Sequence, residues 1–228
     1  MAVFHFLQFD VDDRDCGMKI CSDSVLLGGW FFRPYPGAAR VLDVGSGSGV
    51  LALIAAQFCP QARITGIEID PAAARTSTYN FDHSPWATRL NTFEGSFEDF
   101  PATQADLIVS NPPYFTNGEK AQCNRRATAR HQSTLTYASL SAFAARNLTP
   151  HGHLGLVAPA EFEDYIIFGA ELAGLCLNRL CRVRTSPRKA PTRILLDFSR
   201  LDTTPVISEL AIRDENYIAL VGDLYTKI

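Results

Sequence analysis

The 228-residue sequence has no uninterrupted apolar run that approaches the roughly 18 residues of a membrane-spanning helix, so we expect no membrane segment. We also expect no signal peptide, because the short apolar stretch Val3–Phe9 is followed at once by aspartates. No two of the six cysteines have the spacing of a zinc or redox motif, and no histidine completes a ligand set. These absences favour a cytoplasmic protein with reduced thiols and no metal, built around one sizeable core.

Acidic residues are missing from two stretches in the second half of the chain. Residues 1–119 carry 7 Lys and Arg against 14 Asp and Glu, whereas residues 120–228 carry 14 against 10. No acid occurs in 120–160 or in 178–193. Such stretches suit a polyanionic partner, with an ordinary solvated face as the alternative. The phosphate contacts that we expect from them are Arg125, Arg126, Arg130, Arg184, Arg188, Lys189 and Arg193.

Strand-like and helix-like segments alternate from residue 40 onward. The predicted strands are 40–44, 63–69, 89–94, 105–110, 153–158, 177–184 and 192–198. Helical patterns cover 50–58, 72–81, 135–146 and 160–175, and a turn is expected at 149–152. This order predicts an α/β fold with a doubly wound, mostly parallel seven-stranded sheet, whose last two strands form an antiparallel hairpin. Residues 40–228 would form one domain.

The first 39 residues stand outside this alternation. A strand-like run at 3–9 precedes the turn-like Asp10–Asp15, and Met18–Cys21 is expected to return as the partner strand. Ser22 is then expected to cap a short helix that continues through Phe31. We expect this N-terminal extension to cover the ligand pocket or the edge of the sheet.

A glycine-rich sequence, Asp43–Val44–Gly45–Ser46–Gly47–Ser48–Gly49, joins the first predicted strand to its helix. In an open parallel sheet, ligands bind beyond the carboxyl ends of the strands, which is where this turn lies. Its G-x-G-x-G spacing differs from the G-x-G-x-x-G pattern that binds a pyrophosphate, and the preceding acid favours a cationic or hydroxyl-bearing ligand. S-adenosylmethionine, with its methionyl ammonium, is such a ligand. The expected contacts are Asp43, Gly45, Ser46, Gly47 and Gly49.

Two further strand ends would complete the cofactor site. Glu68 ends the second strand, where its carboxylate can accept both ribose hydroxyls, and Ile69 lies beside it. Asp70 is an alternative ribose ligand, although an Asp-Pro sequence is equally a turn former. Ser96 and Phe97 follow the third strand, where an adenine ring would be held; Phe97 could instead belong to the core.

The tetrad Asn111–Pro112–Pro113–Tyr114 follows the fourth, almost wholly apolar strand. An aromatic or amide nitrogen is a poor nucleophile because its lone pair is delocalised. Two acceptors placed on its hydrogens favour pyramidal nitrogen, and here they would be the side-chain oxygen of Asn111 and the carbonyl of Pro112. The prolines stiffen the loop and offer no competing N–H, while Tyr114 can stack on a planar target. Together with the glycine loop, the tetrad predicts methyl transfer onto a planar nitrogen.

Across residues 40 to 200, the sequence resembles the class I S-adenosylmethionine-dependent methyltransferases, on the strength of Asp43–Gly49, Glu68 and the tetrad. The resemblance implies a Rossmann-like fold, S-adenosylmethionine as the cofactor and catalytic roles for Asn111, Pro112, Pro113 and Tyr114. Similar tetrads occur in amino-methyltransferases that modify adenine, exocyclic guanine amines or glutamine amides.

Within that class, the chain is most similar to the bacterial tRNA methyltransferases that modify the 6-amino group of the adenine beside the anticodon of valine tRNA. The segments that carry this resemblance are Gly17–Lys19, Ser22–Asp23, Leu26–Trp30, Ser84–Trp86 and Ala190–Leu196, with Ile212–Arg213 and Asn216–Tyr217 near the C-terminus. It implies that Lys19, Asp23 and the segment Leu26–Trp30 line the methionine end of the cofactor pocket; plain helix packing is the alternative for that segment. Where family members often have an acid for the adenine amine, this chain has Ser96, and Glu98 or Asp99 could take over.

Other substrates remain open at this point. One is a glutamine side-chain amide in a release factor or ribosomal protein, although those enzymes usually carry a larger helical N-terminal domain. Exocyclic amino groups of ribosomal RNA are a second, and a non-catalytic nucleic-acid binding module with a vestigial cofactor site is a third. The anticodon arm of a tRNA is favoured because a base leaves its stack most easily in an RNA loop. Tyr114 and Phe115 would then contact the target base, and we expect a monomer.

Overall fold

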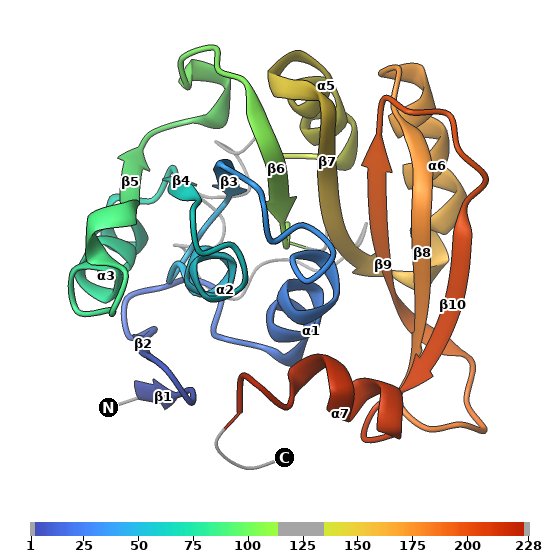
Figure 1. Ribbon diagram of the computed structural model, residues 1–228, viewed down its shortest axis with the longest axis horizontal. Helices are drawn as coiled ribbons and strands as arrows, with labels where there is room; N and C mark the ends of the chain where they lie inside the picture. Colours follow the sequence, from blue (N-terminus) through green and yellow to red (C-terminus); the bar gives the residue numbers. More distant parts are fainter. Residues whose placement is uncertain (1–2, 114–134, 226–228) are drawn as a thin grey trace, which may run out of the picture.

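The computed structural model describes residues 3–113 and 135–225 (Figure 1). The helices are α1 (Ser22–Phe31), α2 (Val50–Phe58), α3 (Pro71–Asp82), α5 (Tyr137–Asn147), α6 (Glu163–Leu172) and α7 (Glu215–Val221). Short 3-10 turns are η1 (Ala87–Arg89), η2 (Phe97–Asp99) and η3 (Ala160–Phe162). The strands are β1 (Val3–His5), β2 (Asp10–Asp12), β3 (Arg40–Val44), β4 (Arg63–Glu68), β5 (Leu90–Glu94), β6 (Ala105–Ser110), β7 (Leu148–Pro159), β8 (Cys176–Arg184), β9 (Pro191–Ser199) and β10 (Val206–Ala211).

The main sheet has the strand order β10-β8-β9-β7-β6-β3-β4-β5. Every neighbouring pair is parallel except those of β9, which is antiparallel to both β7 and β8. This confirms the doubly wound, mostly parallel sheet and its antiparallel hairpin. The chain reverses its winding direction between β3 and β6, and that neighbouring pair is where an open sheet of this type binds its ligand.

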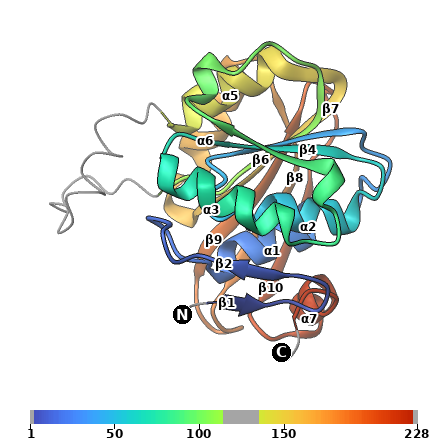
Figure 2. The same ribbon diagram turned by 90° about the vertical axis from the view of Figure 1, so that its left-hand side faces the viewer.

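Hydrophobic residues of the central strands are buried on both faces of the sheet. Leu107 and Val109 of β6 pack into one cluster with α1 and α2, while Ile108 between them packs into a second cluster with α5 and α6. Figure 2 shows the resulting layers, with α5 on one side of the sheet and α2 and α3 on the other. The near-continuous apolar run of β6 therefore reflects helices on both faces.

Two features of the sheet differ from the sequence-based expectation. The sheet has eight strands among the described residues, because β10 adds to its edge in parallel with β8. Residues 149–152, expected as a turn, belong to β7, which pairs with β6 from Ala105 onward. A Cβ on Gly152 would lie 2.8 Å from the carbonyl oxygen of Ala105, so glycine is needed there for close strand packing rather than for a turn.

The N-terminal extension forms a hairpin, but its second strand is Asp10–Asp12 and not Met18–Cys21. The ring of Phe6 stacks on that of Phe9 with 4.5 Å between centroids, and this pair closes the hairpin early. The N-cap residue of α1 is Cys21, without a side-chain capping bond, so Ser22 begins the helix instead of capping it.

Because the parallel strands of the main sheet run in the same direction, their carboxyl ends lie along one edge of the sheet, and the arrowheads of β6 and β10 point toward it at the bottom of Figure 1. The extension and α7 lie toward the bottom of Figure 1, whereas α1 packs against the face of the sheet beside α2. Because β8 runs parallel to β7, the loop between β8 and β9 lies at the carboxyl edge too. Within the described ranges, no helix is long and apolar enough to cross a membrane.

Candidate active site

The glycine loop turns tightly between β3 and α2. Gly45, Gly47 and Gly49 have φ of 71°, 55° and 79°, a region that favours glycine, and a Cβ on Gly49 would lie 2.4 Å from the ring of Phe81. The backbone N–H groups of Gly45 and Ser46 both donate to the carbonyl of Ile67 on the neighbouring strand. The loop is therefore fixed against β4 and cannot accept side chains at its glycines.

Two oxygens of the glycine loop are buried without a partner among the described residues. The Asp43 side chain accepts from the backbone N–H of Ala52 at 3.1 Å through Oδ2, while its Oδ1 and the hydroxyl of Ser46 have no hydrogen bond there. Burial raises the pKa of Asp43 to about 7, and the charge of Glu68 adds to the rise. Orphaned buried acceptors are costly, so this loop fits a ligand that donates hydrogen bonds, as an ammonium or hydroxyl does.

Glu68 joins the glycine loop to the end of β4. Its Oε2 accepts from the backbone N–H of Gly47 at 2.7 Å, and its Oε1 accepts from that of Asp70 at 2.9 Å. Burial of the carboxylate raises its pKa. Asp70 caps α3 through the N–H of Ala72, which is the turn-forming role. Glu68 thus lies beside the loop with the exposed Ile69 next to it, and its contact with a ribose stays a prediction.

Of the two residues after β5 that were predicted to hold the adenine, Ser96 is partly exposed and Phe97 is buried. The hydroxyl of Ser96 accepts from the N–H of Glu98 and begins η2. Phe97 is buried and meets the ring of Phe143 edge-on at 5.4 Å, so its ring packs in the core, the alternative considered above. A contact of Ser96 with the cofactor stays a prediction.

Asn111 lies directly after β6 and is 5% exposed. Its side-chain nitrogen donates to Ser24 Oγ at 2.8 Å, in the first turn of α1, and to Sγ of the N-cap residue Cys21 at 3.6 Å. The preceding Ser110 donates to the carbonyl of Val44 at 2.6 Å and so joins the ends of β6 and β3. These bonds place Asn111 next to the glycine loop, with Pro112 buried and Pro113 exposed after it.

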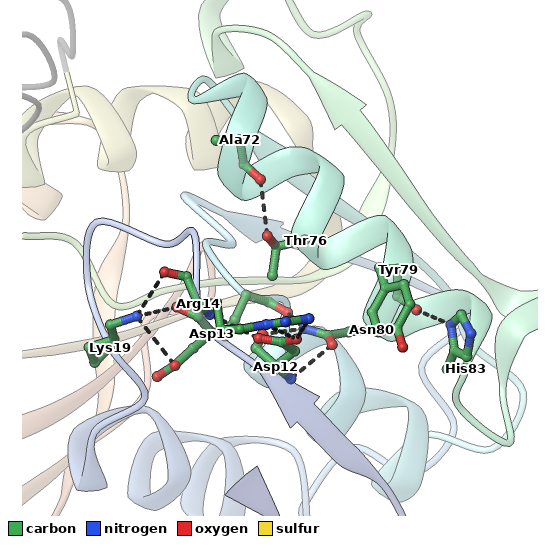
Figure 3. Close-up of polar contacts among 10 residues, drawn as sticks. Asp12, Asp13, Arg14, Lys19, Ala72, Thr76, Tyr79, Asn80 and His83 are labelled. Carbon is green, nitrogen blue, oxygen red and sulfur yellow. Dashed lines mark hydrogen bonds and ion pairs between the residues drawn. The ribbon is translucent and has the colours of Figure 1, made fainter. Parts of the chain in front are cut away.

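The extension is hydrogen-bonded to the cofactor loop through Asn80 of α3. The side chain of Asn80 accepts from the N–H of Asp12 at 2.9 Å and donates to the carbonyl of Asp12 at 2.8 Å (Figure 3). It also donates to the carbonyl of Ser48 at 2.8 Å. Lys19 donates to the carbonyls of Asp13 and Arg14, which closes the loop of the extension. Lys19 thus shapes the extension, and its contact with the cofactor stays a prediction.

The basic side chains of 178–193 are largely matched by acids from other parts of the chain. Arg193 donates to Asp23 at 2.9 Å, and Arg184 donates to Glu209 at 2.7 Å. Arg188 and Lys189 are exposed in the loop between β8 and β9. Tyr114, Phe115, Arg125, Arg126 and Arg130 lie outside the described residues, so their predicted contacts have no structural account here.

Sequence reasoning missed Ser24, Cys21 and Asn80 as site residues. Ser24 is a buried polar residue in the otherwise apolar run that ends with Phe31, and Asn80 lies on the buried face of α3 beside Phe81. A polar residue in an apolar helical face was the available signal. Leu26, Leu27 and Trp30 pack in the core, as the helix-packing alternative expected. In the parts of the chain that the structure describes, no three His, Cys, Asp or Glu side chains gather as metal ligands.

The sheet order, the glycine loop and the acid at the end of β4 define a class I S-adenosylmethionine-dependent methyltransferase. The model of the methyltransferase small domain family matches residues 33–166, and the chain belongs to that family. Its cofactor is S-adenosylmethionine, and the orphaned acceptors of Asp43 and Ser46 fit that molecule.

Curated relatives match the chain over its full length. A tRNA1(Val) (adenine(37)-N6)-methyltransferase of Tolumonas auensis is 38% identical, with 99% of this chain and 97% of the relative covered. The protein of the same name from Shewanella amazonensis is 40% identical, with 99% of each chain covered.

Solved structures share the fold at low identity. A predicted O-methyltransferase from Agrobacterium tumefaciens has a TM-score of 0.68 at 15% identity, covering 88% of this chain and 96% of its own. The glycopeptide N-methyltransferase MtfA, complexed with sinefungin, has a TM-score of 0.59 at 10% identity, covering 80% of this chain and 88% of its own.

Proposed function

We propose that this enzyme methylates the 6-amino group of adenine 37 in tRNA1(Val). The full-length relatives carry that activity in their names. The observation that carries the proposal is the placement of Asn111, buried beside the glycine loop with its amide nitrogen bonded to α1. A carboxamide held in this way suits an amine target, because its oxygen is the atom suited to accept from an NH₂ group.

The roles of the side chains follow from their positions. Asp43, Ser46 and the backbone of Gly45, Gly47 and Gly49 would hold the methionyl part of the cofactor, and Glu68 would hold its ribose. When bound, S-adenosylmethionine supplies an electrophilic methyl group on a sulfonium. Asn111 Oδ1 and the Pro112 carbonyl would accept the two amine hydrogens and so localise the nitrogen lone pair. No strong base is needed, because the proton leaves after the nitrogen has become cationic.

We also propose that residues 1–39 cover the cofactor pocket of the domain formed by 40–228. Cys16 supports this role, because it is buried and the nearby charge of Glu68 contributes to the rise of its pKa to about 12. Further along the extension, Ser24 reaches Asn111. The extension therefore passes from the ribose end of the site to its methyl-transfer end.

The RNA would bind at the same sheet edge. Tyr114 and Phe115 would contact the target base, and Arg125, Arg126, Arg130, Arg188 and Lys189 would contact phosphates. Arg184 and Arg193 would contribute less to phosphate binding, because their guanidinium groups are already bonded to Glu209 and Asp23. A cytoplasmic monomer acting on the anticodon arm is consistent with this proposal.

The test is incubation of the enzyme with labelled S-adenosylmethionine and separate pools of tRNA, ribosomal RNA, DNA and protein. Nucleoside analysis of the labelled tRNA should give N6-methyladenosine, and a tRNA1(Val) transcript with guanosine at position 37 should take no label. Label in a glutamine amide or in ribosomal RNA would contradict the proposal and favour those substrates.

Asn111→Ala should lower the rate of methyl transfer by about 100-fold or more, because the acceptor for the target amine is removed. Cofactor affinity, measured by calorimetry, should stay nearly the same. Asn91→Ala, an exposed asparagine of β5, is the matched control and should leave both quantities intact. Equal loss of cofactor binding and transfer in Asn111→Ala would show that the tetrad is structural.

A further inference from the structure

The N-cap residue and the first turn of α1 supply two acceptors to the side-chain nitrogen of Asn111. Ser24 Oγ lies 2.8 Å from Nδ2, and Cys21 Sγ lies 3.6 Å from it. A carboxamide nitrogen carries two hydrogens, and both of these acceptors lie within their reach. Neither residue belongs to the glycine loop or to the Asn-Pro-Pro-Tyr tetrad.

The orientation of this carboxamide decides whether it can assist an amine. The oxygen and nitrogen ends of an asparagine are nearly equal in shape, so a half-turn about the last side-chain bond exchanges them. With the nitrogen toward the target, two N–H donors would face an NH₂ group that needs acceptors. The active orientation therefore needs acceptors on the opposite side of the amide.

Ser24 can be that acceptor because its own hydrogen can be donated to a second partner. Its Oγ lies 4.0 Å from Cys21 Sγ, within reach of a hydrogen bond to sulfur. When the hydroxyl donates to the sulfur, its lone pairs remain for Asn111 Nδ2. In this arrangement the amide nitrogen of Asn111 donates to both Ser24 and Cys21, and Ser24 donates to Cys21.

The turn that carries these acceptors is firmly held. Ser24 is 6% exposed, and every residue from Val25 to Phe31 is buried. Asp23 is bonded to Arg193 of β9 at 2.9 Å, which ties the start of α1 to the sheet. A buried helix turn anchored on both sides is the kind of rigid support that keeps a reactive group in its productive geometry.

We propose that Ser24, assisted by Cys21, is a positioning residue for methyl transfer: it holds the amide nitrogen of Asn111 so that the amide oxygen faces the target amine. This inference rests on the proposed role of Asn111 in amine methylation. It assigns the N-terminal extension and α1 a part in the transfer step in addition to covering the pocket.

Ser24→Ala should lower kcat about tenfold, the effect of losing one hydrogen bond that orders the amide. Affinity for S-adenosylhomocysteine and the KM for tRNA should change little, because Ser24 would contact neither. Ser24→Thr retains a hydroxyl and should recover most of the rate. Ser22→Ala is the matched control, since Ser22 is an exposed serine in the same helical turn.

A second readout does not depend on the RNA substrate. In the nitrogen-labelled protein, the side-chain amide signals of Asn111 are identified by their loss in Asn111→Ala. Ser24→Ala should shift them and speed their hydrogen exchange, and Ser22→Ala should not. If wild-type enzyme fails to label tRNA but these signals respond as stated, the proposed function fails while the positioning role stands. Unchanged signals in Ser24→Ala, or a fall in cofactor affinity equal to that in kcat, would overturn the inference.

Discussion

Two residues of this site each have a buried oxygen without a partner among the described residues. The structure places most of its buried side-chain donors and acceptors in hydrogen bonds, yet Asp43 Oδ1 and Ser46 Oγ lack one within the described residues. Both belong to the turn that the sequence assigned to the cofactor. An unsatisfied acceptor of this kind costs about 1–3 kcal/mol, which a ligand that donates a hydrogen bond would recover.

Cofactor affinity should depend on the protonation of Asp43. Its pKa is about 7 in the folded protein without ligand because the carboxyl group is buried, against an ordinary value of 3.8. A bound ammonium favours the carboxylate, so binding releases a proton when the pH is below 7. Affinity for S-adenosylmethionine should therefore rise with pH, by up to about tenfold per unit, and level off above 7.

Calorimetry between about pH 6 and pH 8 tests this dependence. The Asp43→Asn variant supplies the comparison, since the ligand's own amine titrates equally with both proteins. The variant should bind more weakly at high pH and lack the rise that the wild type shows. A rise of the same size in Asp43→Asn would rule out Asp43 as its source.

Single residues also show what local sequence patterns leave undetermined. The sequence identified Asp43, Glu68 and Asn111 because each lies at the end of a strand, and the structure brings all three to one edge. It could not identify the bond between Arg193 and Asp23, because the partners are 170 residues apart. The pattern of charges along the sequence predicts a phosphate contact for Arg193 but does not reveal this partner.

At the scale of elements, the extension and the glycine loop are joined through one side chain of α3. Asn80 makes three hydrogen bonds, two to Asp12 and one to the carbonyl of Ser48. Asn80 is 3% exposed, so water cannot replace these bonds when the side chain is removed. The position of the extension should therefore affect the order of the cofactor loop.

Asn80→Ala should lower the free energy of unfolding by about 2–4 kcal/mol, because buried backbone groups lose their partners. Amide hydrogen exchange should become faster in residues 10–20 and in 45–49 together. Thr76→Ala is the matched control on α3, since among the described residues the Thr76 hydroxyl bonds only to Ala72 of its own helix (Figure 3). Faster exchange in the extension alone would contradict the coupling.

The alternation of apolar and polar segments predicted the elements between residues 40 and 198, because buried strands and amphipathic helices have distinct periods. It missed β10, whose first four residues are exposed and which is held by pairing with β8 at the edge. The turn predicted at 149–152 was also wrong, since these residues belong to β7 and Gly152 allows the close approach of β7 to Ala105. The period of apolar residues indicates a strand from its own sequence. The pairing of β10 with β8 and the packing of Gly152 against Ala105 depend instead on a neighbouring strand.

Across the whole molecule, the distribution of charge changes once the chain is folded. Four arginines of β8 and β9 meet acids from elsewhere: Arg179 with Asp197, Arg182 with Glu163, Arg184 with Glu209 and Arg193 with Asp23. The net charge of the stretch 178–193 therefore overstates what it offers to a polyanion. The exposed cations Arg188 and Lys189, in the loop at the carboxyl edge, are the better phosphate contacts in this part of the chain.

Replacing both Arg188 and Lys189 by alanine should make the salt dependence of tRNA binding less steep. Each phosphate contact releases about one counterion from the RNA on binding, so losing two contacts should make the slope of log affinity against log salt shallower by about 1 to 2.

Arg184→Ala should change the slope less, because Glu209 already binds its guanidinium group. Arg63→Ala is the control, since Arg63 is exposed at the amino end of β4, on the opposite edge. Filter-binding titrations over a range of salt concentrations measure all of these slopes. If the double variant keeps the wild-type slope while Arg63→Ala reduces it, the RNA binds the other edge of the sheet, away from Asn111.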